Sequence, residues 1–174
     1  MKNSLAALLV MAFFALGCGL DKLAGVRTDS NSNANTSVAN ANTNTNASAT
    51  PALASMNDTL FAETAFKSLT SGDSSAEWMV DWDSFRVADV DVGSQYRAMP
   101  GDTAKGAFRT SFISTFANSF KQTGAQLTDV SGWKEQSRAG DTTTVVGKIR
   151  NGKSIRLTVT HKDGRQGLAS IDVD

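Results

Sequence analysis

The sequence predicts an α+β domain in which about three N-terminal helices pack on a curved, four-stranded antiparallel meander. Three observations carry this prediction. Phenylalanines at helical spacing run through residues 102–123, and after Gly124 the apolar period changes to two. The dipeptides Asn151-Gly152 and Asp163-Gly164 then separate the later apolar runs, as hairpin turns do. We therefore expect a long amphipathic helix that lies on the apolar face of a sheet.

Charge is balanced over the whole chain but not along it. The 174 residues include 17 Lys and Arg against 17 Asp and Glu, so nothing in the total favours a nucleic-acid partner. Acidic residues dominate 58–102, and basic residues dominate 134–166. Two interpretations stay open: ordinary solvated surfaces, or a basic face for an anionic partner in a cell envelope.

Residues 1–17 have the layout of a secretory signal peptide. Lys2 supplies a short positive region, and the uncharged apolar run 5–16 follows it. As a helix, this run is too short to span a bilayer core about 30 Å thick. It leads to Gly17 and then to Cys18, the one cysteine of the chain. No disulfide within one chain is therefore possible.

The stretch Ala15-Leu16-Gly17-Cys18 resembles the lipobox of bacterial lipoproteins, although Ala15 and Leu16 depart from its commonest pattern. In that family the cysteine thiol is diacylated and the chain is cut just before it. The resemblance implies that Cys18 carries palmitate-type lipid, so that a bilayer holds the protein in a bacterial cell envelope. Gly19 in place of Asp favours the outer membrane. The alternative is an ordinary cleaved signal peptide with an incidental cysteine.

Residues 18–56 predict a lipid-anchored tether. From Thr28 to Met56 the chain is rich in Asn, Ser, Thr and Ala and has almost no large apolar side chain. Burial cannot offset the entropy lost on ordering such a segment, so we expect it to be disordered. Fully extended, it reaches about 100 Å. The globular α+β domain then occupies residues 57–174.

Two helices are predicted at the start of this domain. The first covers 58–71, ends at Gly72, and has a broad apolar face formed by Leu60, Phe61, Ala65, Phe66 and Leu69. Ser74 and Glu77 have the spacing of a capping box. They predict a second, short helix, whose apolar face carries Trp78, Met79, Trp82 and Phe85.

Residues 86–101 predict an irregular extended connection or a short strand. The long helix follows, with Asp102 as its expected N-cap and Gly124 just past its end. Its apolar stripe consists of Phe108, Phe112, Phe116 and Phe120. This stripe is the expected spine of the core.

The four expected strands begin near residue 126 and end at residue 174. A two-residue turn at 151–152 would pair Val146 with Leu157 and place Thr144 on the same face. A two-residue turn at 163–164 would place Leu168 on that face too. A bulge near Gly167 is then needed to return the last apolar residues to the core.

This order of elements over 57–174 resembles the nuclear-transport-factor-like, or cystatin-like, α+β superfamily. The resemblance implies a bent sheet that wraps the long helix and leaves a conical pocket, which some members use for small ligands or catalysis. Five residues are candidates for lining such a pocket: Trp78, Trp82, Tyr96, Trp133 and His161. Ordinary core packing is the alternative for the aromatic residues, and a structural position at a strand end is the alternative for His161.

No catalytic set, cofactor motif or metal site is evident. Three His or Cys ligands for zinc cannot be assembled, and the carboxylates around Asp89 and Asp91 lack the spacing of a calcium loop. We therefore expect a non-enzymatic envelope lipoprotein that binds a small molecule, a protein partner or cell-wall material. The alternative is a small-molecule enzyme of the ketosteroid-isomerase kind, using a pocket Asp with Tyr96 or His161.

Overall fold

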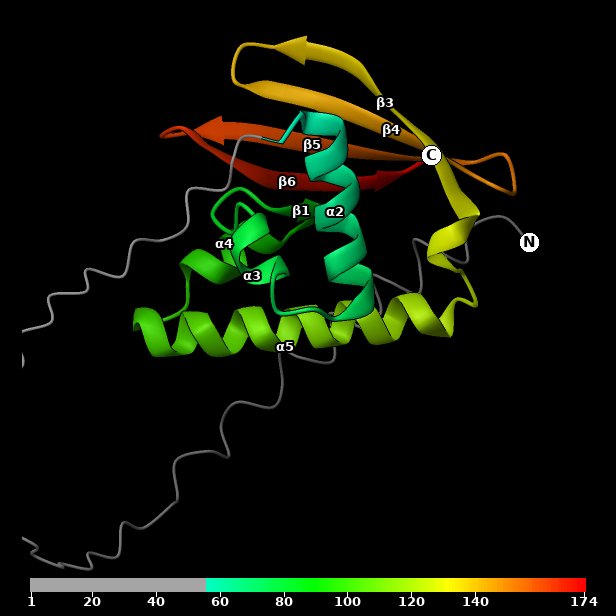
Figure 1. The fold of residues 1–174 in the computed structure, drawn as a ribbon. Coiled ribbons are helices and arrows are strands. Elements are labelled where there is room, and N and C mark those ends of the chain that lie inside the picture. Colours follow the sequence, from blue (N-terminus) through cyan, green and yellow to red (C-terminus); the bar gives the residue numbers. More distant parts are fainter. Residues whose placement is uncertain (1–55) are drawn as a thin grey trace, which may run out of the picture.

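Residues 56–174 are described by a computed structural model (Figure 1). The expected signal peptide at 1–17, the expected acylation site Cys18 and all of the expected tether except Met56 lie outside the described residues. The described part is an α+β fold with four α-helices and a mixed, six-stranded sheet. None of the helices in this part is both long and apolar enough to cross a bilayer.

Helix α2, Asp58–Ser71, has the bounds that the sequence predicts. Asn57 caps its start, because the side-chain oxygen accepts a hydrogen bond from the Leu60 N–H at 2.8 Å. Gly72 closes its end in the left-handed region with φ 81°, a conformation that glycine adopts without a steric cost. The helix is therefore defined at both ends by local chemistry.

Helix α3, Ala76–Met79, is shorter than predicted, and the expected capping box is wrong. The residue before the helix is Ser75, whose N–H donates to the Asp73 carboxylate at 2.7 Å. Val80 is extended and bridges to Leu168, so the chain joins the sheet and cannot continue as a helix. The predicted apolar face of 75–85 is nevertheless buried, apart from Trp78.

The connection at 86–101 contains more regular structure than predicted. It holds β1 (Arg86–Val87), β2 (Val90–Asp91) and α4 (Val92–Arg97). Strand β1 pairs antiparallel with β2 and parallel with β6, which makes the sheet mixed. The expected four-stranded antiparallel sheet is therefore corrected to six strands in the order β2-β1-β6-β5-β4-β3. A two-residue strand is too short to show periodicity, so the sequence, which allows a short strand here, does not fix its bounds or its pairing partners.

Helix α5, Gly101–Gln122, is the long helix that the phenylalanine stripe predicts. Its expected N-cap is wrong: Pro100 has that position, and Asp102 lies in the first turn. The stripe is buried at all positions except Phe108, which is half-buried. Its main contacts are with helices, whereas α2 contacts β3, β4, β5 and β6. Thus α2, rather than α5, covers the sheet (Figure 1).

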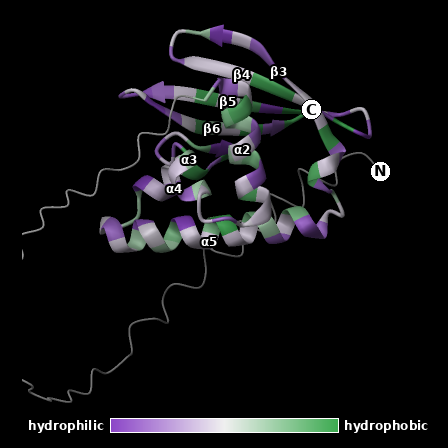
Figure 2. Ribbon diagram, viewed as in Figure 1, coloured by the Kyte–Doolittle hydropathy of each residue, from purple (hydrophilic) through white to green (hydrophobic). Residues whose placement is uncertain are grey.

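The last four strands are β3 (Val130–Ala139), β4 (Thr142–Ile149), β5 (Ser154–Lys162) and β6 (Arg165–Val173). A short 3-10 turn, η3 (Leu127–Asp129), leads into β3. Figure 2 shows apolar residues concentrated along β4, β5 and α2, with polar residues over much of α5. The core therefore lies between the sheet and the helices that cover it.

The predicted turn between β5 and β6 is confirmed. Asp163 and Gly164 have φ values of 52° and 73°, as a two-residue turn of this kind requires. The predicted bulge is also confirmed, because Thr158 pairs with Ser170 while the next residue of β5 pairs with Leu168. Ala169 is therefore the extra residue, and Ile171 and Val173 return to the side of the core.

The predicted register of β4 on β5 is wrong by one residue. Val145, rather than Val146, pairs with Leu157. Thr143, rather than Thr144, lies fully buried on the same face. Because side chains alternate between the two faces of a strand, this one-residue shift places every side chain of β4 on the face opposite to the predicted one.

Loop length explains this register. The Ile149 N–H donates to the Lys153 carbonyl at 2.8 Å, so three residues, 150–152, lie between the paired strands. The dipeptide Asn151-Gly152 predicts a two-residue loop. The extra loop residue is the physical source of the shift in β4.

Candidate functional site

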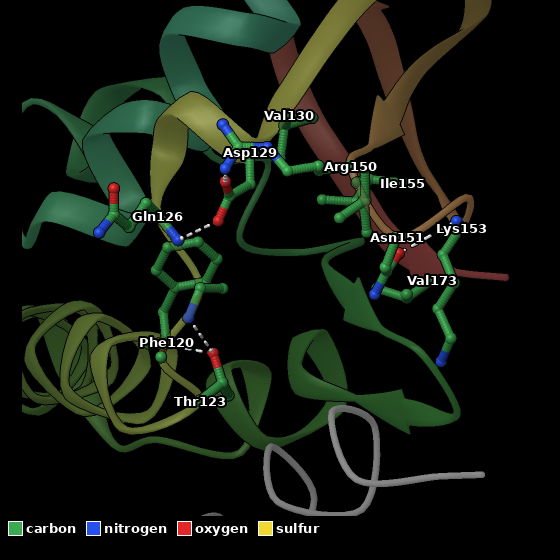
Figure 3. Close-up of a pocket in the computed structure, with 13 residues that line it drawn as sticks. Phe120, Thr123, Gln126, Asp129, Val130, Arg150, Asn151, Lys153, Ile155 and Val173 are labelled. Carbon is green, nitrogen blue, oxygen red and sulfur yellow. Dashed lines mark hydrogen bonds and ion pairs between the residues drawn. The ribbon is translucent and has the colours of Figure 1, made fainter.

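A groove opens where the end of α5 faces the hairpin between β4 and β5 (Figure 3). Its volume is about 390 Å³. The apolar wall consists of Phe120, Ala125, Val130, Ile149, Ile155 and Val173. The polar rim consists of Thr123, Gln126, Asp129, Arg150, Asn151 and Lys153. We call this feature the α5–hairpin groove.

Local hydrogen bonds hold the helical side of the groove. The Thr123 hydroxyl donates to the Phe120 carbonyl at 2.6 Å and accepts from the Ala125 N–H at 3.2 Å. The Asp129 carboxylate accepts from the Gln126 N–H at 3.0 Å (Figure 3). The segment after α5 is thus folded back on itself, and it presents Ala125 to the groove as part of a fixed turn.

The hairpin side of the groove carries two cations. A guanidinium nitrogen of Arg150 lies 3.4 Å from an Asp129 carboxylate oxygen, although the Arg150 side chain is 78% exposed. The ammonium group of Lys153 has no ion-pair partner among residues 56–174. The rim therefore carries two cations and one carboxylate, which pairs with Arg150 alone, and it keeps an excess of positive charge.

A second hollow of about 360 Å³ lies beside α3 and the turn between β5 and β6. Three of the predicted pocket residues line it, namely Trp78, Trp82 and Tyr96. Only Trp78 presents its ring to solvent, with 66% exposed. Trp82 and Tyr96 are buried in a cluster of aromatic rings, so they act mainly as core.

The other two predicted pocket residues lie apart from both hollows. Trp133 packs on Phe66, with 5.8 Å between ring centroids, and covers Gly147. His161 lies with its Nε2 atom 2.9 Å from a carboxylate oxygen of Asp58. The structure therefore brings together three of the five candidates and separates them from Trp133 and His161.

Asp58 organises contacts across the whole sheet, although the sequence does not single it out. Its side chain is 2% exposed and contacts one polar side chain from each of the four long strands. These contacts are Arg138 of β3 at 2.6 Å, Thr143 of β4 at 2.6 Å, His161 of β5 at 2.9 Å and Gln166 of β6 at 2.7 Å. Asp58 opens α2, where an acidic residue suits the helix dipole, and nothing local indicates these distant partners.

The surroundings of Asp58 hold it ionised. Burial raises the pKa of the carboxyl, but hydrogen bonds from Thr143 and Gln166 and electrostatic interactions with His161 and Arg138 lower it. The resulting pKa lies below the ordinary value of 3.8. A buried carboxylate of this kind, with every partner supplied by the protein, stabilises the fold and is a weak proton acceptor at neutral pH.

Asp81 is held in the same way at the edge of the second hollow. Burial raises the pKa of its carboxyl, while hydrogen bonds from Lys162, Thr160 and Ser84 and the charge of Lys162 lower the pKa below 3.8. The ammonium of Lys162 lies 2.7 Å from the carboxylate. Neither of these two carboxyls has the raised pKa that a general acid working near neutral pH needs.

Residues 56–174 contain no group of three His, Cys, Asp or Glu side chains that could hold a metal ion.

Comparisons of the chain with protein-family models, with curated proteins and with solved structures gave no match. The α5–hairpin groove is therefore the best candidate site on its geometry, because it joins an apolar wall to a polar, cationic rim.

Proposed function

We propose that the chain is a lipid-anchored lipoprotein of a bacterial cell envelope, held in the outer membrane, whose domain binds a ligand in the α5–hairpin groove. The observation that carries the binding part is the groove itself, a concave apolar surface bordered by a few polar groups. Small-molecule sites usually have this form. We also propose that the domain belongs to the nuclear-transport-factor-like superfamily, which the sequence of helices followed by β3–β6 supports.

The anchor part rests on the sequence. The apolar run before Gly17 and Cys18, followed by a polar tether, is the arrangement expected of a lipoprotein. A single acyl chain holds a protein on a membrane only reversibly, whereas two or three chains on one cysteine hold it durably. The tether would then let the domain reach ligands away from the bilayer surface.

The alternative, an enzyme of the ketosteroid-isomerase kind, has less support. Such an enzyme needs an accessible base beside its substrate. The Tyr96 hydroxyl accepts a hydrogen bond from Arg109 at 3.0 Å. Both ring nitrogens of His161 face oxygen atoms, of Asp58 at 2.9 Å and of Asp141 at 3.3 Å. The partners of His161 therefore occupy both of its ring nitrogens, and the Tyr96 side chain is buried in a cluster of aromatic rings.

The binding proposal is tested with a neutral, environment-sensitive naphthylamine probe and the full chain carrying Cys18→Ser, so that no acyl group competes. We expect saturable binding to this protein. Ala125→Phe, which fills the groove, should weaken binding about tenfold. The matched control is Ala107→Phe on the exposed side of α5. Absence of saturable binding, or equal binding by both variants with unchanged circular dichroism, would contradict the proposal.

The anchor has a separate test in bacterial cells. The unmodified chain should incorporate radiolabelled palmitate, and Cys18→Ser should abolish the incorporation, because Cys18 is the one thiol in the sequence. Fractionation of the same cells should place the labelled protein with the outer membrane. Label that persists in the Cys18→Ser protein would refute acylation at this residue.

A further inference from the structure

We propose that the α5–hairpin groove takes a single-chain amphiphile with an anionic head group, a fatty acid or a lysophospholipid. This inference rests on the proposed function, since it names the ligand class of the same groove. It follows from three features of the described residues: an apolar wall continuous with the core, an excess of positive charge on the rim, and a hairpin whose backbone is held in place.

The wall continues the hydrophobic core to the surface. Phe120 and Ile155 belong to the buried core, and four partly exposed apolar residues beside them extend it, namely Ala125, Val130, Ile149 and Val173. A hydrocarbon chain laid on this wall would cover apolar surface that is otherwise in water. The volume of about 390 Å³ lies near the lower end of the range for ligand pockets. It suits one acyl chain better than two.

The rim selects the sign of the head group. Lys153 has no acidic partner in the described part of the chain. A guanidinium nitrogen of Arg150 lies 3.4 Å from an Asp129 carboxylate oxygen, and the Arg150 side chain remains largely in solvent. A carboxylate or phosphate head group would accept charge-assisted hydrogen bonds from both of these cations. A neutral lipid such as an alcohol or a sterol would use the wall but leave the two cations without a partner.

Arg150 and Lys153 lie on a turn whose backbone is held by hydrogen bonds. The Ile149 N–H donates to the Lys153 carbonyl at 2.8 Å, and the Lys153 N–H donates to the Asn151 side-chain oxygen at 3.1 Å. In Figure 3 Arg150 extends toward Asp129, whereas Lys153 extends away from it. Because the backbone that carries both cations is already ordered, the entropy lost when an anion binds is limited to that of the two side chains.

The groove is less suited to nucleotides. An aromatic ring that stacks on a base must present its face, and the one aromatic residue of the wall, Phe120, is almost fully buried. The apolar wall instead offers a continuous surface for hydrophobic contact. Such contact does not depend on orientation, so it suits a flexible hydrocarbon chain.

The test is competition with the naphthylamine probe on the full chain carrying Cys18→Ser, with each lipid below its micelle concentration. We expect dodecanoate and lauroyl-lysophosphatidylglycerol to displace the probe, and dodecanol to bind about tenfold more weakly. Affinity should rise about fourfold for each methylene added while the chain still fits. The stronger of the two anions identifies the source, a free fatty acid or a membrane-derived lysolipid.

Variants of the cations test the anionic head group independently of binding in the groove. Lys153→Gln should weaken dodecanoate binding about fivefold and leave dodecanol binding unchanged. Lys148→Gln, at an exposed residue of β4 outside the groove, is the matched control and should change neither. If dodecanol and dodecanoate bind equally, or Lys153→Gln has no effect, the anionic class is overturned while the groove remains a binding site. If the probe does not bind at all, the proposed function itself fails.

Discussion

An oxygen of the Asp58 carboxylate lies 2.6 Å from a guanidinium nitrogen of Arg138, 80 residues away in the chain. The two side chains differ in environment, since Asp58 is 2% exposed and Arg138 is 51% exposed. The same carboxylate oxygen accepts a hydrogen bond from the Thr143 hydroxyl at 2.6 Å. The first turn of α2 is thereby fastened to the edge strand β3 and to its neighbour β4.

Asp58→Asn should destabilise the domain by about 2–3 kcal/mol, because Arg138 loses a charged acceptor and the new amide meets donors in a buried site. Chemical denaturation followed by circular dichroism measures this change. Glu135→Gln is the matched control: Glu135 is the exposed partner of the same arginine, and its loss should cost less than about 0.5 kcal/mol. Equal effects of the two substitutions would contradict a central role for Asp58.

Acid should remove the contribution of Asp58. Its pKa in the folded protein lies below the ordinary value of 3.8, so the stabilisation is complete well above that pH and is lost as the pH falls through the folded pKa. The stability difference between the unmodified protein and Asp58→Asn should therefore shrink between about pH 5 and pH 3. Denaturation at a series of pH values measures it, and a difference that stays constant over this window would sink the prediction.

The register of β4 can be tested with adjacent threonines. Thr143→Val should destabilise the domain by about 1–2 kcal/mol, because the buried Asp58 carboxylate loses a hydrogen-bond donor. Thr144→Val, on the other face of the strand, should change stability by less than about 0.5 kcal/mol. The opposite order of effects in chemical denaturation would favour the register that the Asn151-Gly152 turn predicts.

Two glycine substitutions should have opposite signs. A Cβ at Gly147 would lie 2.7 Å from the Trp133 ring, so Gly147→Ala should force the ring to move and cost about 1–3 kcal/mol. A Cβ at Gly106, within α5, meets nothing closer than 3.8 Å. Gly106→Ala should therefore stabilise the protein by about 0.5–1 kcal/mol. Thermal unfolding compares them, and a stabilised Gly147→Ala protein would contradict the packing of Trp133.

The sequence by itself determined the features that depend on neighbouring residues. The phenylalanine spacing was sufficient to predict α5, and Gly72 marks the end of α2 because a left-handed residue is needed there. Asp163-Gly164 predicted its turn correctly, since the two φ values it requires are local. In the candidate groove, the hairpin cations belong to the basic stretch 134–166, which the sequence leaves open as either a solvated surface or a face for an anionic partner.

Only the tertiary structure decided the features that depend on distant residues. Strand β1 is two residues long and exists because β6 lies beside it, and the register of β4 follows from one extra residue in the next loop. The Asp58 contacts and the groove each combine residues from several elements. Side-chain pairings of this kind depend on which elements pack together, and that is set by burial of the whole core rather than by any local pattern.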